Sequence, residues 1–288
     1  MPSIRQIRRR IRSVQNTAKI TKAMQMIAAS KMRRAQERVF ASRPYAEKML
    51  QVLGNLAGAQ DDEGLHPLLE RREPQKITLL HITPDRGLTG GLIGNLNRRA
   101  AQFLLEDRLP SSVVTVGRRG RDFMVRHGQN VQAVFTDIGD KARMADILPI
   151  ARLLMNDYTE KKTDKVYLLF AQFVSTAQQR PLLRQVLPVE TAHMESAVPV
   201  RKLDYIFEPD AAGVLGQLLP RFVEMQVYQA VLEAIASEQS ARMVAMQNAT
   251  DAAKDMIGSL TLVLNKARQE SITKELLDIV GGVAALEG

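Results

Sequence analysis

The sequence predicts an α/β fold in which a central domain of mostly parallel strands lies between two long terminal helices. Residues 4 to 39 and 215 to 267 place apolar and small side chains at alternating steps of three and four, which is the seam of a coiled coil. Neither Gly nor Pro occurs between Arg221 and Ile257, so the second helix has no breaker there. Between these ends, short apolar segments alternate with amphipathic ones, which is typical of a parallel sheet with helical cover.

The first predicted helix, residues 1 to 58, has a thin seam and a strongly basic surface. Small residues such as Ala28 occupy the middle of the seam and bury little apolar area. The repeat also drifts relative to the helix there, near Ile20, Met24 and Ile27. Residues 1 to 38 carry eleven Lys and Arg side chains and one acid, so they hold the whole positive excess of a chain whose net charge is +9.

This basic surface has three open interpretations. It is a solvated helix face, a surface for nucleic-acid phosphates, or a surface for an acidic protein partner. Only Phe40 and Tyr45 are aromatic among residues 1 to 76, so a platform for stacking nucleic-acid bases is missing.

A connection at residues 59 to 75, with Gly, Pro and mixed charges, is expected to lead into a central domain of residues 76 to 209. Strands are expected at 76–83, 113–117, 131–137 and 165–174, and helices at 91–105, 119–127 and 142–158. Residues 182 to 190 could add an edge strand, because Pro188 fits only an edge or a strand end.

The second long helix, residues 210 to 288, is too long for a compact domain. If residues 211 to 280 form one helix, it measures roughly 105 Å, about three times the span of a small domain. Other chains must therefore surround it. Pro44 and Pro220 fall inside the two proposed helices, where a bend in the axis is expected.

The sequence shows no catalytic residues, no cofactor-binding residues and no metal ligands. The Gly-rich turn from Pro84 to Asn95 has Thr89 where a dinucleotide fingerprint needs Gly, and no P-loop Lys follows, so we expect a tight strand-to-helix turn. Gly117 to Arg121 could bind phosphate or form a simple polar turn. The four His residues lack metal-ligand spacing, Cys is absent, and no apolar run approaches the length of a membrane span.

At this point the chain resembles the γ subunit of F-type ATP synthases, bacterial type, over essentially its whole length. The strongest matches are IRSVQNTAKITKAMQMIAASKMRRAQ (11–36), ASRPYAE (41–47), DRGLTGGL (85–92), ASEQSARMVAMQNATDAAKDMI (236–257) and LNKARQESITKELLDIVGG (264–282). Thr89 stands where many members of the family carry Cys, and no Cys-bearing regulatory insertion of the chloroplast type is present.

The resemblance implies that the terminal helices form an antiparallel coiled coil and that the central domain is Rossmann-like. It implies a central rotor shaft of the F1 sector, CF(1), which couples proton flow to ATP synthesis at the β-subunit catalytic sites and regulates ATPase activity. Such a subunit has no catalytic site and no cofactor of its own. Its partners are the α and β subunits, the ε subunit and the c-ring, and its place is peripheral, on the cytoplasmic side of a bacterial cell inner membrane.

The resemblance also assigns contact residues by position. The β-subunit contact of the lower shaft comprises Arg8, Arg9, Met24 and Lys31. The contact of the upper shaft with the β-subunit catch loop comprises Arg242, Arg268, Gln269, Thr273 and Glu275. Contact with the c-ring and ε falls to Tyr205 and Glu208.

Two rival functions come from other classes. A basic coiled-coil nucleic-acid-binding protein would explain the charge, and an enzyme built on the α/β domain would explain the Gly-rich turn. Neither explains the long lone helix.

Overall fold

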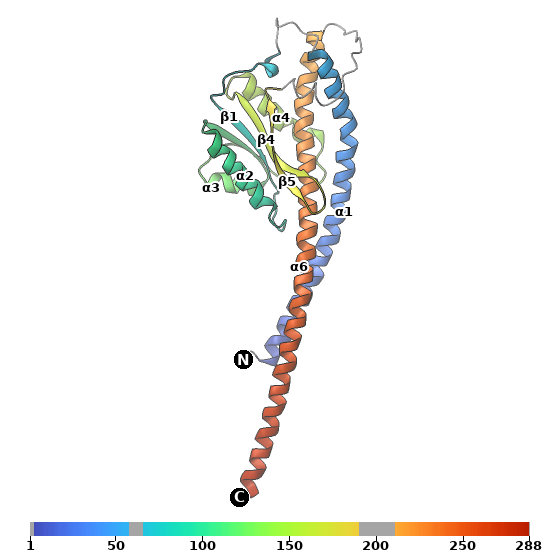
Figure 1. Ribbon diagram of the computed structural model, residues 1–288, viewed down its shortest axis with the longest axis vertical. Coiled ribbons are helices and arrows are strands. Elements are labelled where there is room, and N and C mark those ends of the chain that lie inside the picture. Colours follow the sequence, from blue (N-terminus) through green and yellow to red (C-terminus); the bar gives the residue numbers. More distant parts are fainter. Residues whose placement is uncertain (1–2, 58–65, 190–210, 288) are drawn as a thin grey trace. The chain divides into compact units, whose positions relative to one another are not determined.

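The computed structural model describes residues 3–57, 66–189 and 211–287 (Figure 1). The chain divides into two compact units. We call residues 1–28 with 243–288 the coiled-coil unit, and residues 29–242 the α/β unit. Part of the predicted connection, together with Tyr205 and Glu208, lies outside the described residues. The proposed division at residues 58, 75 and 209 stays a prediction.

Two helices contribute to both units: α1 (Ile4–Ala57) and α6 (Ala211–Glu287). The prediction of two long terminal helices is confirmed. Pro44 lies inside α1 and Pro220 inside α6, and neither residue ends its helix.

The coiled-coil unit pairs the first turns of α1 with the second half of α6 along the predicted seam. Ile7, Thr21 and Ala28 are buried on α1, and Met246, Thr250 and Ala253 are buried on α6. The hydroxyl groups of Thr21 and Thr250 lie 2.7 Å apart in a hydrogen bond. The expected drift of the seam does not bury its large residues, because Ile20 and Ile27 are 60% and 56% exposed.

The two helices of this unit end at different levels. An antiparallel pairing that places Thr21 beside Thr250 brings Ile4, the first residue of α1, opposite Ala267. Beyond that level α6 continues, and every side chain from Ile272 to Val283 is exposed. The last turns of α6 therefore have no companion helix within this unit.

The α/β unit contains a five-stranded sheet in the order β3-β2-β1-β4-β5. Its strands are β1 (Ile77–Ile82), β2 (Ser111–Val116), β3 (Val131–Phe135), β4 (Lys165–Phe173) and β5 (Gln179–Leu187). The first four are parallel, and β5 runs antiparallel to β4 at one edge. The predicted strands are confirmed. The edge strand begins three residues earlier than expected and ends before Pro188, whose nitrogen cannot donate to a ladder.

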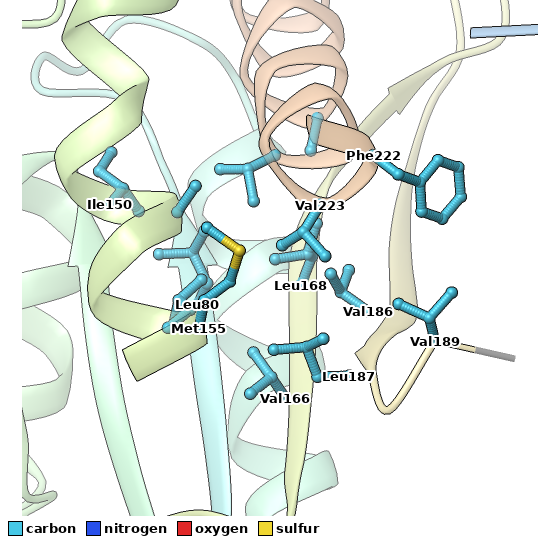
Figure 2. Close-up of a cluster of buried hydrophobic side chains, with 14 of the residues drawn as sticks. Leu80, Ile150, Met155, Val166, Leu168, Val186, Leu187, Val189, Phe222 and Val223 are labelled. Carbon is cyan, nitrogen blue, oxygen red and sulfur yellow. The ribbon is translucent and has the colours of Figure 1, made fainter. Parts of the chain in front are cut away.

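Helices cover both faces of this sheet: α2 (Leu92–Asp107), α3 (Arg118–Arg126) and α4 (Met144–Thr159), as predicted, together with α6. A short 3-10 helix, η1 (Pro67–Leu69), precedes β1. One face packs against α4 and α6, and the other against α2 and α3. Figure 2 shows the first of these cores, where Ile150 and Met155 of α4 and Val223 of α6 lie around Leu80 and Leu168.

The core explains why α6 starts where it does. Its first turns carry Leu215, Leu219, Phe222, Val223 and Val227 into the sheet core, and α1 adds Met49 and Leu53. Burial of each of these side chains stabilises the fold by about 1.5–3 kcal/mol. The start of α6 is thus a core helix of the α/β unit, and its later turns belong to the coiled coil.

Candidate functional site

The start of α1 presents an unneutralised basic surface. Seven side chains of the coiled-coil unit are exposed there: Arg5, Arg8, Arg9, Arg10, Arg12, Lys19 and Lys22. None of them forms a salt bridge with another residue in the part of the chain that the structure describes. Charges held in solvent in this way attract an acidic partner over about 10 Å at 0.1 M salt.

Met24 and Lys31, predicted to share this surface, are less exposed. Met24 is half-buried beside the seam. Lys31 belongs to the α/β unit, where its Nζ lies 2.5 Å from Oδ2 of Asp140 and its side chain is 36% exposed. The positive charge of Lys31 is therefore already paired within the chain.

The predicted upper contact residues fall into two groups. Arg268, Gln269, Thr273 and Glu275 are all exposed on α6, and all four lie beyond Ala267, the level where α1 begins. Six apolar side chains in the same stretch are about half exposed or more: Ile272, Leu276, Leu277, Ile279, Val280 and Val283. This end of α6 can therefore bury apolar area and form hydrogen bonds with a surrounding partner.

Arg242 lies elsewhere, in the α/β unit. Its Nη2 donates to Oε1 of Glu238 at 2.7 Å and, more weakly, to the carbonyl oxygen of Gly87 at 3.4 Å. Burial raises the pKa of Glu238, and the Arg242 guanidinium partly offsets that rise. Roughly seven turns of helix separate Arg242 from Arg268. Arg242 thus holds the Gly-rich turn and does not join the exposed end of α6.

Asp85, in the turn after β1, places its carboxylate at the N-terminus of α3. Asp85 accepts hydrogen bonds from the backbone N–H groups of Arg118 and Asp137, each at 3.0 Å. Arg118 opens α3, so Asp85 occupies the position at the helix N-terminus where a phosphate would bind. The side chain of Arg118 in turn donates to both carboxylate oxygens of Asp137, at 2.5 and 2.6 Å.

The glycine that the fold needs most is at the start of α3. Gly117 has φ of +94°, and a Cβ there would lie 1.9 Å from the carbonyl oxygen of Thr83. At Gly87, Gly91 and Gly94 no atom comes that close. The close backbone packing expected at residues 84 to 95 is therefore found one βα unit later, between the end of β1 and the start of α3.

Among the His residues that the structure describes, only His81 is fully buried, and its contact is structural. Nε2 of His81 on β1 lies 2.9 Å from Oδ1 of Asn97 on α2, which requires the tautomer with the proton on Nε2. Burial lowers the pKa of His81 to about 4. Among the described residues no group of three His, Cys, Asp or Glu side chains could hold a metal ion.

Asp140 makes three contacts that no sequence motif predicts. Its two carboxylate oxygens meet Lys31 of α1 and Gln239 of α6, at 2.5 and 2.8 Å, and its carbonyl oxygen accepts from Arg38 at 3.1 Å. A single acid after Gly139 is an ordinary turn residue, and its partners are about 100 residues away on either side, so no local pattern reveals it.

No described helix has the length and apolar character that crossing a bilayer requires.

Comparison with solved structures gives the fold. A chain in the Euglena gracilis mitochondrial ATP synthase, from a structure of OSCP, F1 and c-ring, is similar with a TM-score of 0.68 and 19% identity, covering 98% of this chain and 94% of that one. A chain of the Tetrahymena thermophila central stalk and c-ring is similar with a TM-score of 0.62 and 24% identity, covering 80% of this chain and 99% of that one.

Sequence comparison gives the family. The family model described as ATP synthase matches residues 3–286. The ATP synthase gamma chain of Dehalococcoides mccartyi is 58% identical over 287 residues, which are 99% of this chain and 100% of that relative. The gamma chain of Roseiflexus castenholzii is 51% identical over 290 residues, with 99% of each chain covered. On this similarity, which extends through both terminal helices and the α/β domain, the chain belongs to the ATP synthase gamma chain family.

Proposed function

We propose that this chain works through two surfaces of its coiled-coil unit, a basic one on α1 and an apolar one on α6. As a gamma chain it is the central shaft of the F1 sector of a rotary ATP synthase and a non-catalytic, peripheral subunit. The α and β subunits surround it, and ε and the c-ring are its further partners. The observation that carries the proposal is the exposed stretch from Ile272 to Val283, which has apolar side chains and no companion helix.

The coupling needs no chemistry on this chain. A single asymmetric shaft inside a ring of three β subunits touches each of them differently, so each catalytic site is held in a different state with a different nucleotide affinity. Rotation exchanges those states among the sites. One proton crossing 100 mV releases only about 2.3 kcal/mol, so several crossings must be pooled mechanically before one ATP is released.

The basic surface fits an acidic segment of a β subunit, and this partner is favoured over nucleic acid by the family of the chain. Arg8 and Arg9 are exposed and free of salt bridges within the described residues, and Met24 lies between them and the start of the α/β unit along α1. Contacts of this kind are long-range, shallow and sensitive to salt. Lys31 reaches a β subunit only if it leaves Asp140.

At the other surface, Arg268, Gln269, Thr273 and Glu275 supply polar groups among the apolar side chains of α6 and contact the β-subunit catch loop. Arg242 contributes indirectly, because it is held by Glu238 and positions the turn at Gly87. Tyr205 and Glu208, outside the described residues, are assigned to the c-ring and ε by resemblance alone. The bacterial sources of the relatives favour the cytoplasmic side of the cell inner membrane.

Reconstitution tests the proposal. The purified chain is mixed with α and β subunits, the complex is isolated, and its ATP hydrolysis is compared with that of the ring alone. We expect one chain per ring and higher activity. A variant shortened after Ser271 is expected to bind less firmly, because it loses the exposed apolar end. No complex, or a chain that retains DNA instead, would contradict the proposal.

The basic surface is tested by R8A/R9A, with R126A as the control. Arg126 is exposed on α3 in the α/β unit, so its replacement removes one positive charge, against two in R8A/R9A, from a surface with no assigned contact. We expect R8A/R9A to weaken the salt dependence of activity in the complex and R126A to leave it unchanged. Equal salt dependence in both variants would refute a role for this surface.

A further inference from the structure

We propose that Asp140 is a positioning residue for energy coupling, because it fastens both shaft helices to the α/β domain at one point. This inference rests on the proposed function, since fastening matters for coupling only if the chain is a shaft. Nothing in the sequence motifs or in the family resemblance singles this residue out. All of its partners belong to the α/β unit.

Each of the three oxygen atoms of Asp140 contacts a different side chain. Oδ2 pairs with Nζ of Lys31 at 2.5 Å, Oδ1 accepts from Nε2 of Gln239 at 2.8 Å, and the carbonyl oxygen accepts from Nη1 of Arg38 at 3.1 Å. Gln239 is 2% exposed, and Asp140 is 37% exposed on its side chain. Charge-assisted hydrogen bonds this short are about twice as strong as neutral ones.

The partners are spaced so that one acid can reach them. Lys31 and Arg38 are seven residues apart, two turns on the same side of α1. Gln239 comes from α6, so the carboxylate bridges the two helices. Asp140 itself lies in the turn between β3 and α4, directly after Gly139, whose φ is +70°. This positive φ lets the chain reverse there and present the acid to the helices.

Apolar packing is weak at this level of the helices. The buried residues closest in sequence are small, Ala35 on α1 and Ala236, Ser237 and Ser240 on α6. Small side chains bury little apolar area. They therefore resist movement of the helices against the domain less than Met49, Leu53 and Phe222 do in the sheet core. A polar contact therefore has more influence here than in the core.

The helices also differ in how the domain holds them. Ser237 donates to the carbonyl oxygen of Ala171 at the end of β4, and Ser240 donates to that of Thr176, so α6 has other polar ties to the domain. Between described side chains of α1 and the α/β domain, the polar contacts both end on Asp140: those of Lys31 and Arg38. Loss of this carboxylate removes the Lys31 contact, so α1 keeps only the Arg38 contact with the backbone carbonyl oxygen, whereas α6 keeps both serine contacts.

The consequence concerns the transmission of torque along the shaft. When torque is applied at one part of the shaft and resisted at another, the α/β domain and both helices must turn together. A loosened α1 would let the domain turn partly without it, so more protons would be consumed for each ATP synthesised and fewer would be pumped for each ATP hydrolysed. Hydrolysis would continue, because the catalytic groups belong to other subunits.

The experiment uses the whole enzyme in lipid vesicles. ATP hydrolysis and ATP-driven proton pumping are measured for wild type, D140A, D140N and the exchanged pair K31D/D140K. For D140A we expect near-normal hydrolysis and pumping per ATP lower by about two- to fivefold, the worth of a partly exposed ion pair. D140N keeps the shape and one acceptor, so its defect is expected to be smaller.

The exchanged pair separates coupling from simple stability. K31D/D140K restores opposite charges, and Gln239 can offer its amide oxygen to the new Lys, so pumping per ATP is expected to recover towards wild type. D122A is the matched control, since Asp122 is exposed and pairs with its neighbour Arg121. We expect normal pumping from it. Thermal melting of each purified chain shows whether a variant folds.

Two results would overturn the inference. One is normal pumping per ATP by D140A in an assembled, hydrolysing enzyme. The other is a D140N defect as large as that of D140A although both variants fold and assemble. Failure of the proposed function is distinguishable, because then the wild-type chain itself would neither assemble with α and β subunits nor raise their hydrolysis.

Discussion

Lowering the pH should reduce the free energy of unfolding of the α/β unit, in part through protonation of His81. The H81Q variant should lack the part of the reduction that comes from His81. His81 is fully buried on β1, and its pKa is lowered from 6.5 to about 4. In the unfolded chain the imidazole binds a proton as the pH falls through 6.5, whereas in the folded chain it does so only near pH 4. The unfolded state therefore gains relative stability throughout this window.

The magnitude follows from the two pKa values. Each unit of difference corresponds to about 1.4 kcal/mol, so the free energy of unfolding falls by about 2 kcal/mol at pH 5 and about 3 kcal/mol at pH 4 through this residue. Above pH 7 its contribution to the pH dependence vanishes. Gln has a donor for Oδ1 of Asn97 and does not titrate. H81Q therefore keeps the hydrogen bond but loses the contribution of residue 81 to the pH dependence of the free energy of unfolding.

The assay is urea unfolding of the purified chain at several pH values between 7.5 and 4.5, with fluorescence from a label on the α/β unit. Carboxylates also titrate in this range, so the informative quantity is the difference between wild type and H81Q. That difference should shift in favour of H81Q by about 2 kcal/mol between pH 7.5 and 5. Parallel curves for the two proteins would refute the reasoning.

Three further predictions concern stability and coupling. G117A should destabilise the α/β unit by more than about 3 kcal/mol because its Cβ would meet a carbonyl oxygen, whereas G94A, with open space around it inside α2, should stabilise by about 0.5–1 kcal/mol; thermal melting compares them. T21V/T250V should stabilise the coiled coil by about 1 kcal/mol, measured by helix signal against urea, and a loss of stability would show that the hydroxyl pair outweighs apolar burial. Substitution of Gln269, which is exposed, should lower coupled ATP synthesis without changing the melting temperature, and the reverse pattern would count against a contact role.

Periodicity predicted most of the fold. The steps of three and four identified the seam positions, and alternation of short apolar runs with amphipathic segments identified every strand and helix of the sheet region. These signals are local, because each reflects which side of a helix or strand faces the core. The drift towards Ile20 and Ile27 was wrong, since both stay exposed. The buried seam positions here are Thr21 and Ala28.

The polar contacts could not be predicted in the same way. Asp85, Asp140 and Arg242 act through partners that the topology brings together from distant parts of the sequence. An isolated Asp after Gly or before Arg has many ordinary roles in turns, so its type and neighbours carry no signal of its partners. The resemblance grouped Arg242 with the upper-shaft contact residues, which stays a prediction, and its contacts with Glu238 and Gly87 within the α/β unit had no signal in the sequence.

The unequal ends of the two helices in the coiled-coil unit give it two different cross-sections. Where α1 and α6 lie side by side, the section is about twice as wide in one direction as in the other, because each helix is about 10 Å across. Beyond Ala267 only α6 remains, and its section is nearly round. An elongated section pushes on its surroundings differently at each angle, whereas a round one presents almost the same outline throughout a turn. If the unit turns inside a ring, the outline that the ring meets changes with angle along the paired helices and stays nearly constant along the end of α6.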